Sequence, residues 1–219
     1  MKQPDPDRKP YLGMRPGDLD DKWYAKFWNP EMAPLPAHIK EALLLGPQAW
    51  PLGLVLDDAA SLASPGYQQL ESGYSANADG SVHVATLTRM PRVSPAMWDW
   101  WFGWHGRETQ RYKLWYPKAH LYSEWFPPEA PGTGSATDRD RYVGATSFVD
   151  EYVGGMLGEL AIRFLPPAEF GFDQLGLADP ERATAICARV ALSRFPLDWG
   201  YFVHYVRRVD QGAEMRSRF

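Results

Sequence analysis

The stretch MWDWWFGWHGRETQRYKLWYPKAH, from Met97 to His120, is the part of this sequence on which the predicted fold depends most. Ser94 and Pro95 stand just before it, and a hydroxyl residue followed by proline is typical of the start of a helix. The large apolar residues that follow recur at the spacing of one helical face, and these are Met97, Trp100, Trp101 and Trp104. We therefore predict a helix from Pro95 that ends at Gly106.

Beyond Gly106, the alternation within residues 112–116 is typical of a short strand. The tryptophan-rich helix predicts the wall or lid of a cavity, because each indole buries a large flat surface while its N–H still needs a partner. A bulky hydrophobic core is the alternative interpretation. Polar groups at the edges of the aromatic block favour the cavity, and these are His105, Tyr112 and His120.

The composition excludes several classes of protein. With 219 residues, 45% of them hydrophobic and 23% charged, the chain is long enough for one domain with a full core. The net charge of -4 gives no support for a nucleic-acid partner. Cys187 is the single cysteine, no apolar run has bilayer length, and the start MKQPDPDRKP does not resemble a signal peptide. We predict a cytoplasmic enzyme or binding protein that does not act on nucleic acid or membrane.

Proline and glycine divide the rest of the chain into short elements. The prolines within residues 1–30 predict an extended arm. Four aromatic side chains would attach this arm to the rest of the domain, namely Trp23, Tyr24, Phe27 and Trp28. Helices are expected at 36–45 and, after Asp179-Pro180, around Cys187, and a surface loop at 129–140. Strands are expected at 67–74, 82–90, 142–152, 158–165, 199–209 and 213–219. Antiparallel strands without a βαβ alternation predict a single α+β domain over residues 1–219.

Glu151 is the most informative single position for chemistry. In a strand it shares a face with Val149 and Val153, and a carboxylate on an apolar face is costly to bury unless it is paired or binds a metal. Alternatively, this face is solvated and Asp150 points inward. The residues alone leave the two interpretations equally supported.

His120 and His204 are the histidines with the strongest case for a role. A lone histidine is more often structural, but a helical turn from Pro117 would place His120 and Glu124 on one face, which metal sites use. His204 alternates with Phe202 and Val206, which predicts an inward side chain. It could orient a substrate or transfer a proton, and a satisfied core histidine is an equal alternative.

Three blocks of the sequence, WDWWFGWHG, YKLWYPKAH and FVDEYVGG, resemble the diacetylphloroglucinol hydrolase and phloretin hydrolase family. The resemblance covers about Met90 to the C-terminus. It implies a helix-grip fold of the Bet v 1 or START type, in which a curved antiparallel sheet and helices enclose a cavity. It also implies a zinc-dependent enzyme that hydrolyses the carbon–carbon bond between an acyl group and a phenolic ring.

The resemblance also implies roles for particular residues. His120 and Glu151 match zinc ligands of the family, and Tyr112 matches a residue that hydrogen-bonds the phenolic oxygens of the substrate. Ser123 stands where the family has a substrate-binding asparagine, and a hydroxyl is shorter. The residue patterns add that His204 would act in catalysis together with Tyr112, and that Trp101 and Trp104 would stack on the aromatic ring.

The chain departs from the family pattern at its end. The family takes its other two zinc ligands from a His-x-x-x-Glu pair downstream of a block like EMRSRF, whereas this sequence stops at Phe219. We expect either a missing C-terminal segment or an incomplete site, since stable zinc sites use three or four ligands. Glu124, His204 and Glu214 are the weaker candidates for completing it. The alternative function is a non-catalytic module that binds an aromatic polyketide or similar hydrophobic molecule. With either function, the protein could form a homodimer.

Overall fold

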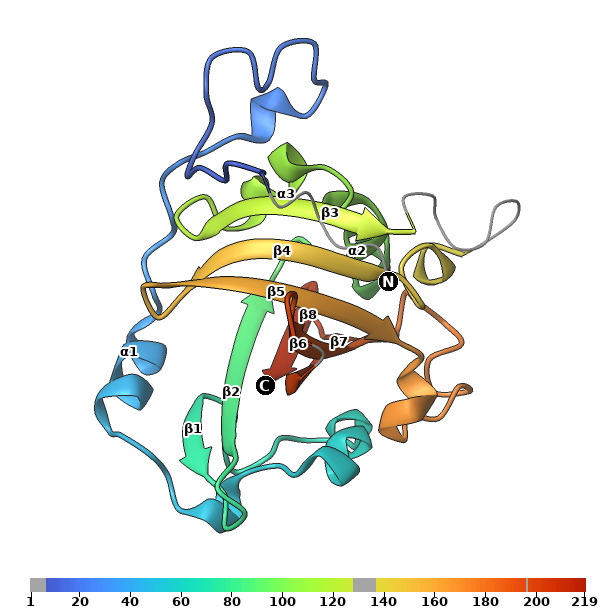
Figure 1. Cartoon of the computed structure of the whole chain (residues 1–219). Helices are drawn as coiled ribbons and strands as arrows, with labels where there is room; N and C mark the ends of the chain where they lie inside the picture. The colour runs from blue at the N-terminus through green and yellow to red at the C-terminus, as the bar shows by residue number, and fades with distance from the viewer. Residues whose placement is uncertain (1–6, 128–136, 196) are drawn as a thin grey trace. The chain divides into compact units, whose positions relative to one another are not determined.

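The computed structural model describes residues 7–127, 137–195 and 197–219. In chain order the elements are η1 (Ala25–Phe27), α1 (Ala37–Leu44), η2 (Trp50–Leu52), η3 (Leu56–Ala63), β1 (Gly73–Ala76), β2 (Val82–Met90), α2 (Pro95–His105), α3 (Thr109–Trp115), β3 (His120–Phe126), η4 (Arg139–Arg141), β4 (Thr146–Val153), β5 (Met156–Leu165), η5 (Pro167–Phe170), β6 (Ala183–Leu192), β7 (Asp198–Arg208) and β8 (Ala213–Arg218). The strands form an eight-stranded antiparallel sheet in the order β1-β2-β8-β7-β6-β5-β4-β3 (Figure 1). The predicted α+β class is confirmed.

The chain divides into two compact units. The first comprises Met1–Pro34, Trp101–Phe164 and Arg189–Trp199, and the second comprises Leu35–Trp100, Leu165–Ala188 and Gly200–Phe219. Helix α2 and strands β6 and β7 run through both. Within the described residues, no helix combines the length and the apolar character needed to cross a bilayer.

In the first unit, β3, β4 and β5 lie side by side as bowed antiparallel strands, and α3 packs against β3 (Figure 1). The predicted pairing of β4 with β5 is confirmed. Gly154 and Gly155 form the turn between these two strands, with positive φ angles of 58° and 84°. Phe102 fills the core of this unit and contacts the rings of Trp115, Tyr142 and Phe164. Residues 128–136, which hold most of the predicted surface loop, lie outside the described part of the chain.

The strand predicted at residues 112–116 is wrong, because residues 112–115 belong to helix α3 and Tyr116 follows it. Tyrosine and tryptophan favour strands in isolation, but tertiary packing overrides such preferences. As a helix, the segment buries Tyr112 and Lys113 together and leaves Tyr116 exposed. A turn at Pro117 is present, because the His120 amide donates to the Tyr116 carbonyl oxygen at 2.9 Å. The expected shared helical face of His120 and Glu124 is wrong, since both belong to strand β3.

Helix α2 lies where it was predicted, but its buried face is different. Met97 and Trp100 are 52% and 40% exposed, whereas Asp99 and Phe102 are buried. Gly106, just after the helix, allows a close approach, because a Cβ there would lie 2.3 Å from Nε1 of Trp125. The three-and-four spacing fits either face, so the residue types alone could not select the buried one.

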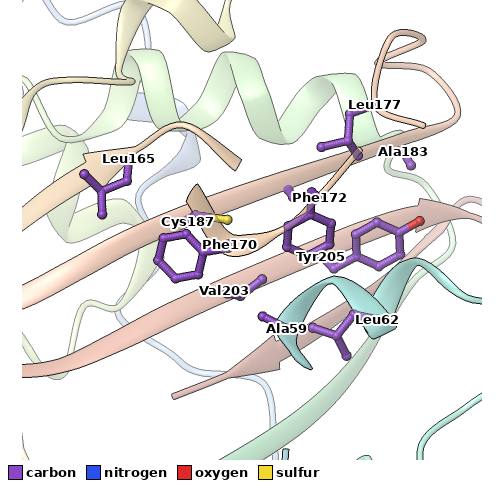
Figure 2. Packing of buried hydrophobic residues seen from close by; sticks show 11 residues of the cluster. Ala59, Leu62, Leu165, Phe170, Phe172, Leu177, Ala183, Cys187, Val203 and Tyr205 are labelled. Atoms are coloured by element: carbon purple, nitrogen blue, oxygen red, sulfur yellow. The ribbon is translucent and has the colours of Figure 1, made fainter. Parts of the chain in front are cut away.

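In the second unit, one face of the sheet carries a hydrophobic core. Figure 2 shows aromatic side chains from η5 and the strands gathered beside the helix that carries Ala59 and Leu62. The cluster consists of Ala59, Leu62, Leu165, Phe170, Phe172, Leu177, Ala183, Ala185, Cys187, Val203 and Tyr205. The predicted hairpin is confirmed, although its first strand, β1, covers Gly73–Ala76 and not residues 67–74. The strands predicted at 199–209 and 213–219 are confirmed as β7 and β8.

The helix predicted around Cys187 is wrong, because Ala183–Leu192 form strand β6. Its residues are buried almost without interruption, so the segment is apolar on both faces. A continuous apolar run fits the helical and the strand periodicity equally well. Cys187 is fully buried, as expected for a structural thiol.

A buried charge cluster in the second unit depends on Glu71. Its carboxylate accepts hydrogen bonds from Arg216 and, at 2.7 Å, from Arg218, two guanidinium groups that are almost fully buried. Burial raises the pKa of Glu71, but the hydrogen bonds from the two arginines outweigh this effect and hold the pKa below its ordinary value. The ionised carboxylate therefore stabilises the folded state.

Glu71→Gln is expected to lower the free energy of unfolding by about 3–5 kcal/mol at pH 7, because it leaves buried guanidinium charge without its counter-ion. The stabilisation is present above the unfolded-state pKa of about 4.3 and is lost as the pH falls through the native pKa. Urea titrations should therefore show that the difference between variant and parent shrinks at acidic pH. Glu41→Gln, at an exposed position of the same unit, is the control. An equal effect of both variants would contradict the prediction.

Candidate active site

Three polar side chains of the first unit meet at one point, namely Tyr112 of α3, His120 of β3 and Glu151 of β4. The Tyr112 hydroxyl donates a hydrogen bond to Oε2 of Glu151, and Nε2 of His120 lies 3.6 Å from the same oxygen. The rings of Tyr112 and His120 stack with centroids 3.7 Å apart. The structure thus brings together three residues that the sequence predicted for the site.

An irregularity in β3 contributes to this arrangement. His120 pairs with Glu151 and Tyr122 pairs with Asp150, so Leu121 is an extra residue in the ladder. Without this bulge, residues two apart would share a face, and His120 would lie on the same side as Tyr122. The bulge places His120 opposite Glu151 instead.

The open choice between Glu151 and Asp150 has a structural answer. Glu151 faces Tyr112 and His120, whereas Asp150, on the opposite face, forms a two-pronged ion pair with Arg8 at 2.6 and 2.8 Å. Asp150 is buried, the Glu151 side chain is 21% exposed, and each has its own partner. Sequence reasoning missed Arg8, because nothing in its local pattern indicates a contact 142 residues away.

The protonation state of His120 follows from its contacts. Its Nδ1 lies 2.8 Å from the carbonyl oxygen of Tyr112, which can only accept, so Nδ1 carries the proton. Burial lowers the pKa of His120 to about 4, so the ring is neutral. The lone pair of Nε2 is left facing the carboxylate of Glu151. Two electron-pair donors facing each other form a binding position for a cation.

Burial also controls the other two groups. It raises the pKa of Tyr112 well above its ordinary value, and the neighbouring charge of Glu151 acts in the same direction, so the phenol stays a neutral hydrogen-bond donor. Burial raises the pKa of Glu151 as well, although the hydrogen bond from Tyr112 opposes that shift. An ionised Glu151 is therefore costly here unless positive charge lies beside it.

A column of stacked rings extends from the site into α2. His105 stacks on Trp101 with centroids 4.9 Å apart and planes at 3°, and it faces Tyr112 at 6.0 Å. Its Nδ1 donates to the carbonyl of Trp101 at 2.8 Å, and burial lowers its pKa to about 3. The predicted aromatic wall is therefore joined to the site through a neutral imidazole.

The other predicted substrate contacts have partners of their own. The Ser123 hydroxyl donates to the carbonyl oxygen of Gly106 at 2.5 Å. Trp104 packs against Trp23 and Tyr24, with ring centroids 5.6 and 5.3 Å away, which confirms that these two aromatic residues attach the N-terminal arm. Glu124, a weaker candidate for a metal ligand, accepts a hydrogen bond from Tyr122.

His204 and Glu214 lie in the second unit. His204 is buried, its Nδ1 lies 2.8 Å from the Ser217 hydroxyl, and burial lowers its pKa to about 4. Its inward orientation was predicted correctly. Glu214 pairs with Arg207 at 2.6 Å.

The donors His120 and Glu151 fit a divalent metal as two of its ligands. Zinc bound to nitrogen and oxygen at about 2.0–2.1 Å in tetrahedral geometry separates the two donor atoms by roughly 3.3 Å, close to the observed 3.6 Å. Within residues 7–127, 137–195 and 197–219, no group of three or more His, Cys, Asp or Glu side chains is arranged to hold a metal. The described site thus supplies two donors.

The fold and the site together define an α+β protein with an imidazole–carboxylate pair beside a phenol and stacked aromatic rings. The sequence model of the family described as DAPG hydrolase PhiG domain matches residues 54–219, and the chain belongs to this family. The chain is 29% identical over 202 residues to a 2,4-diacetylphloroglucinol hydrolase of Pseudomonas protegens. This alignment covers 91% of the chain and 66% of that relative. It is also 29% identical over 167 residues to the phloretin hydrolase of Eubacterium ramulus, which covers 75% of the chain and 61% of that relative. The chain thus spans somewhat less than two thirds of the length of these relatives.

Proposed function

We propose that this protein is a zinc-dependent hydrolase that cleaves the acyl–aryl carbon–carbon bond of a phenolic ketone. The observation that carries the proposal is the pair formed by the Nε2 lone pair of His120 and Oε2 of Glu151, 3.6 Å apart. The names of the relatives support the substrate class. We also propose that the antiparallel sheet and its helices form a helix-grip fold of the Bet v 1 type around the substrate.

The reaction needs a proton at the ring and a water oxygen at the acyl carbon. The bond between the ring carbon and the acyl carbon breaks, and the acyl carbon forms a new bond to the oxygen of water. The ring carbon takes a proton, and the acyl group leaves as a carboxylic acid. The ring can leave once a neighbouring phenol has tautomerised to its keto form, so groups that hold the phenolic oxygens promote the step.

The residues of the first unit suit these tasks. The neutral phenol of Tyr112, whose proton is directed to Oε2 of Glu151 in the free site, turns it to a phenolic oxygen of the substrate. Trp101 and Trp104 hold the aromatic ring and exclude water. His120 and Glu151 are metal ligands. Bound zinc supplies a Lewis acid for the acyl carbonyl or lowers the pKa of a water molecule.

Two further roles complete the proposal. Ser123 contributes the polar substrate contact in β3, although its hydroxyl proton is directed to the Gly106 carbonyl. Proton transfer by His204 stays a prediction, because His204 lies in the second unit, where its Nδ1 faces the Ser217 hydroxyl.

The test is hydrolysis of 2,4-diacetylphloroglucinol by the purified chain, followed as released acetate. Activity is expected to disappear after treatment with a chelator and to return on addition of zinc. A zinc-loaded chain that binds the ketone but releases no acetate would contradict the proposal.

The presence of two donors rather than three in the described site favours one alternative, a module that binds an aromatic ketone without hydrolysing it. Calorimetry separates the two functions. Ketone binding that is equally tight with and without zinc would indicate the module, whereas zinc-dependent turnover would exclude it.

A further inference from the structure

The N-terminal arm (residues 7–28) is attached to the first unit by specific polar contacts. Arg8 places its guanidinium on both oxygens of Asp150, at 2.8 and 2.6 Å, and reaches Glu159 at 3.3 Å. The guanidinium also lies 5.3 Å from the ring centroid of Tyr122. The side chains of Arg8 and Asp150 are only 9% and 2% exposed, so this is a desolvated bidentate pair.

A second contact joins the arm to helix α3. The ammonium group of Lys113 donates to the carbonyl oxygen of Gly13 at 2.8 Å and lies 3.3 Å from the ring centroid of Tyr11. Lys113 is completely buried, and burial lowers its pKa to about 8. Tyr11 is held in turn by Asp18, which accepts its hydroxyl proton at 2.6 Å.

Each of the two residues that the arm contacts is the sequence neighbour of a residue of the site. Asp150 directly precedes Glu151 in β4, and Lys113 directly follows Tyr112 in α3. In a strand, neighbouring side chains point to opposite faces, so a clamp on Asp150 fixes the backbone that presents Glu151 without touching the site. The arm thus holds the neighbour of each partner in the Tyr112–Glu151 hydrogen bond.

We propose that residues 8–13 form a strap that positions Glu151 and Tyr112. Arg8 of the strap and Lys113, which holds the strap from α3, are the positioning residues. The inference rests on the proposed function for its catalytic consequence. The strap precedes residues 54–219, which match the family model. It is inferred from the observed contacts of Arg8 and Lys113.

The experiment compares Arg8→Met with Lys9→Met, its exposed neighbour in the arm. In the full chain, Arg8→Met is expected to lower kcat for diacetylphloroglucinol hydrolysis about 10- to 100-fold with KM nearly unchanged, because small misplacements of reacting groups are costly. Arg8→Lys should restore only part of kcat, since an ammonium cannot form the two-pronged pair. Lys9→Met should match the parent.

A second readout needs no activity. Amide hydrogen exchange in residues 146–153 and 109–115 is expected to accelerate at least about tenfold in Arg8→Met and to stay unchanged in Lys9→Met. If Arg8→Met does not fold, Arg8→Met/Asp150→Asn removes both charges and serves in its place. Exchange and kcat equal to those of Lys9→Met would overturn the strap. Faster exchange in a chain that hydrolyses nothing would support the strap and overturn the proposed function.

Discussion

Glu151→Gln and His120→Ala are each expected to lower kcat/KM for acyl–aryl hydrolysis by at least about 100-fold and to weaken zinc binding in parallel. Removing a residue that only orients a metal ligand costs 10–100-fold, so loss of a ligand should cost at least as much. The losses of turnover and of zinc binding both follow from the proposal that Nε2 of His120 and Oε2 of Glu151 bind the same metal ion. Isothermal titration with zinc and acetate release in the same preparations measure them together.

The stability of Glu151→Gln should move in the opposite direction. Glu151 is largely buried, and its charge raises the free energy of the folded state when no cation is bound. A neutral amide of the same shape removes this cost, so the metal-free variant should melt at or above the temperature of the metal-free parent. Activity and stability would then change with opposite signs, which is typical of a functional group and not of a structural one.

Glu124→Gln is the matched control, because Glu124 lies in β3 and bonds Tyr122 instead of the site. It is expected to keep zinc binding and turnover within about twofold of the parent. Equal losses in Glu124→Gln and Glu151→Gln would show that general damage to the sheet explains them. Undiminished zinc binding in His120→Ala would contradict the assignment of His120.

Local patterns predicted well those parts of the fold that depend on neighbours in the sequence. The β4–β5 hairpin follows from alternating residues on both sides of Gly154-Gly155, and α2 follows from its start at Pro95. Segments α3 and β6 were predicted wrongly, because their apolar residues fit more than one periodicity. Packing against the rest of the chain selected the observed structure in both cases.

The candidate site could be predicted only in part, for a related reason. Alternation left Glu151 and Asp150 equally suited, because both faces of β4 are covered by other parts of the chain at this point. The deciding contacts come from Tyr112, 39 positions away, and Arg8, 142 positions away. The bulge at Leu121 is also absent from any sequence pattern, yet it determines which face carries His120.

Tyr112→Phe is expected to separate zinc binding from turnover. The phenyl ring can keep its stacking on His120, so the imidazole should stay in place and the zinc affinity should stay within about tenfold of the parent. The variant loses the neutral donor for the phenolic oxygen, and removing one such donor costs about 100- to 1,000-fold in kcat. Titration with zinc and acetate release under saturating ketone test the two expectations separately.

Tyr122→Phe provides the comparison, because it removes an equivalent tyrosine–glutamate hydrogen bond, 2.7 Å long, from the opposite face of the same sheet. It should leave kcat nearly unchanged, since its hydroxyl contacts Glu124. A loss of turnover equal in both variants would mean that the Tyr112 hydroxyl matters only for packing. A loss of zinc binding in Tyr112→Phe comparable to that in His120→Ala would instead mean that the hydroxyl acts through Glu151, because it orients the carboxylate that faces the metal.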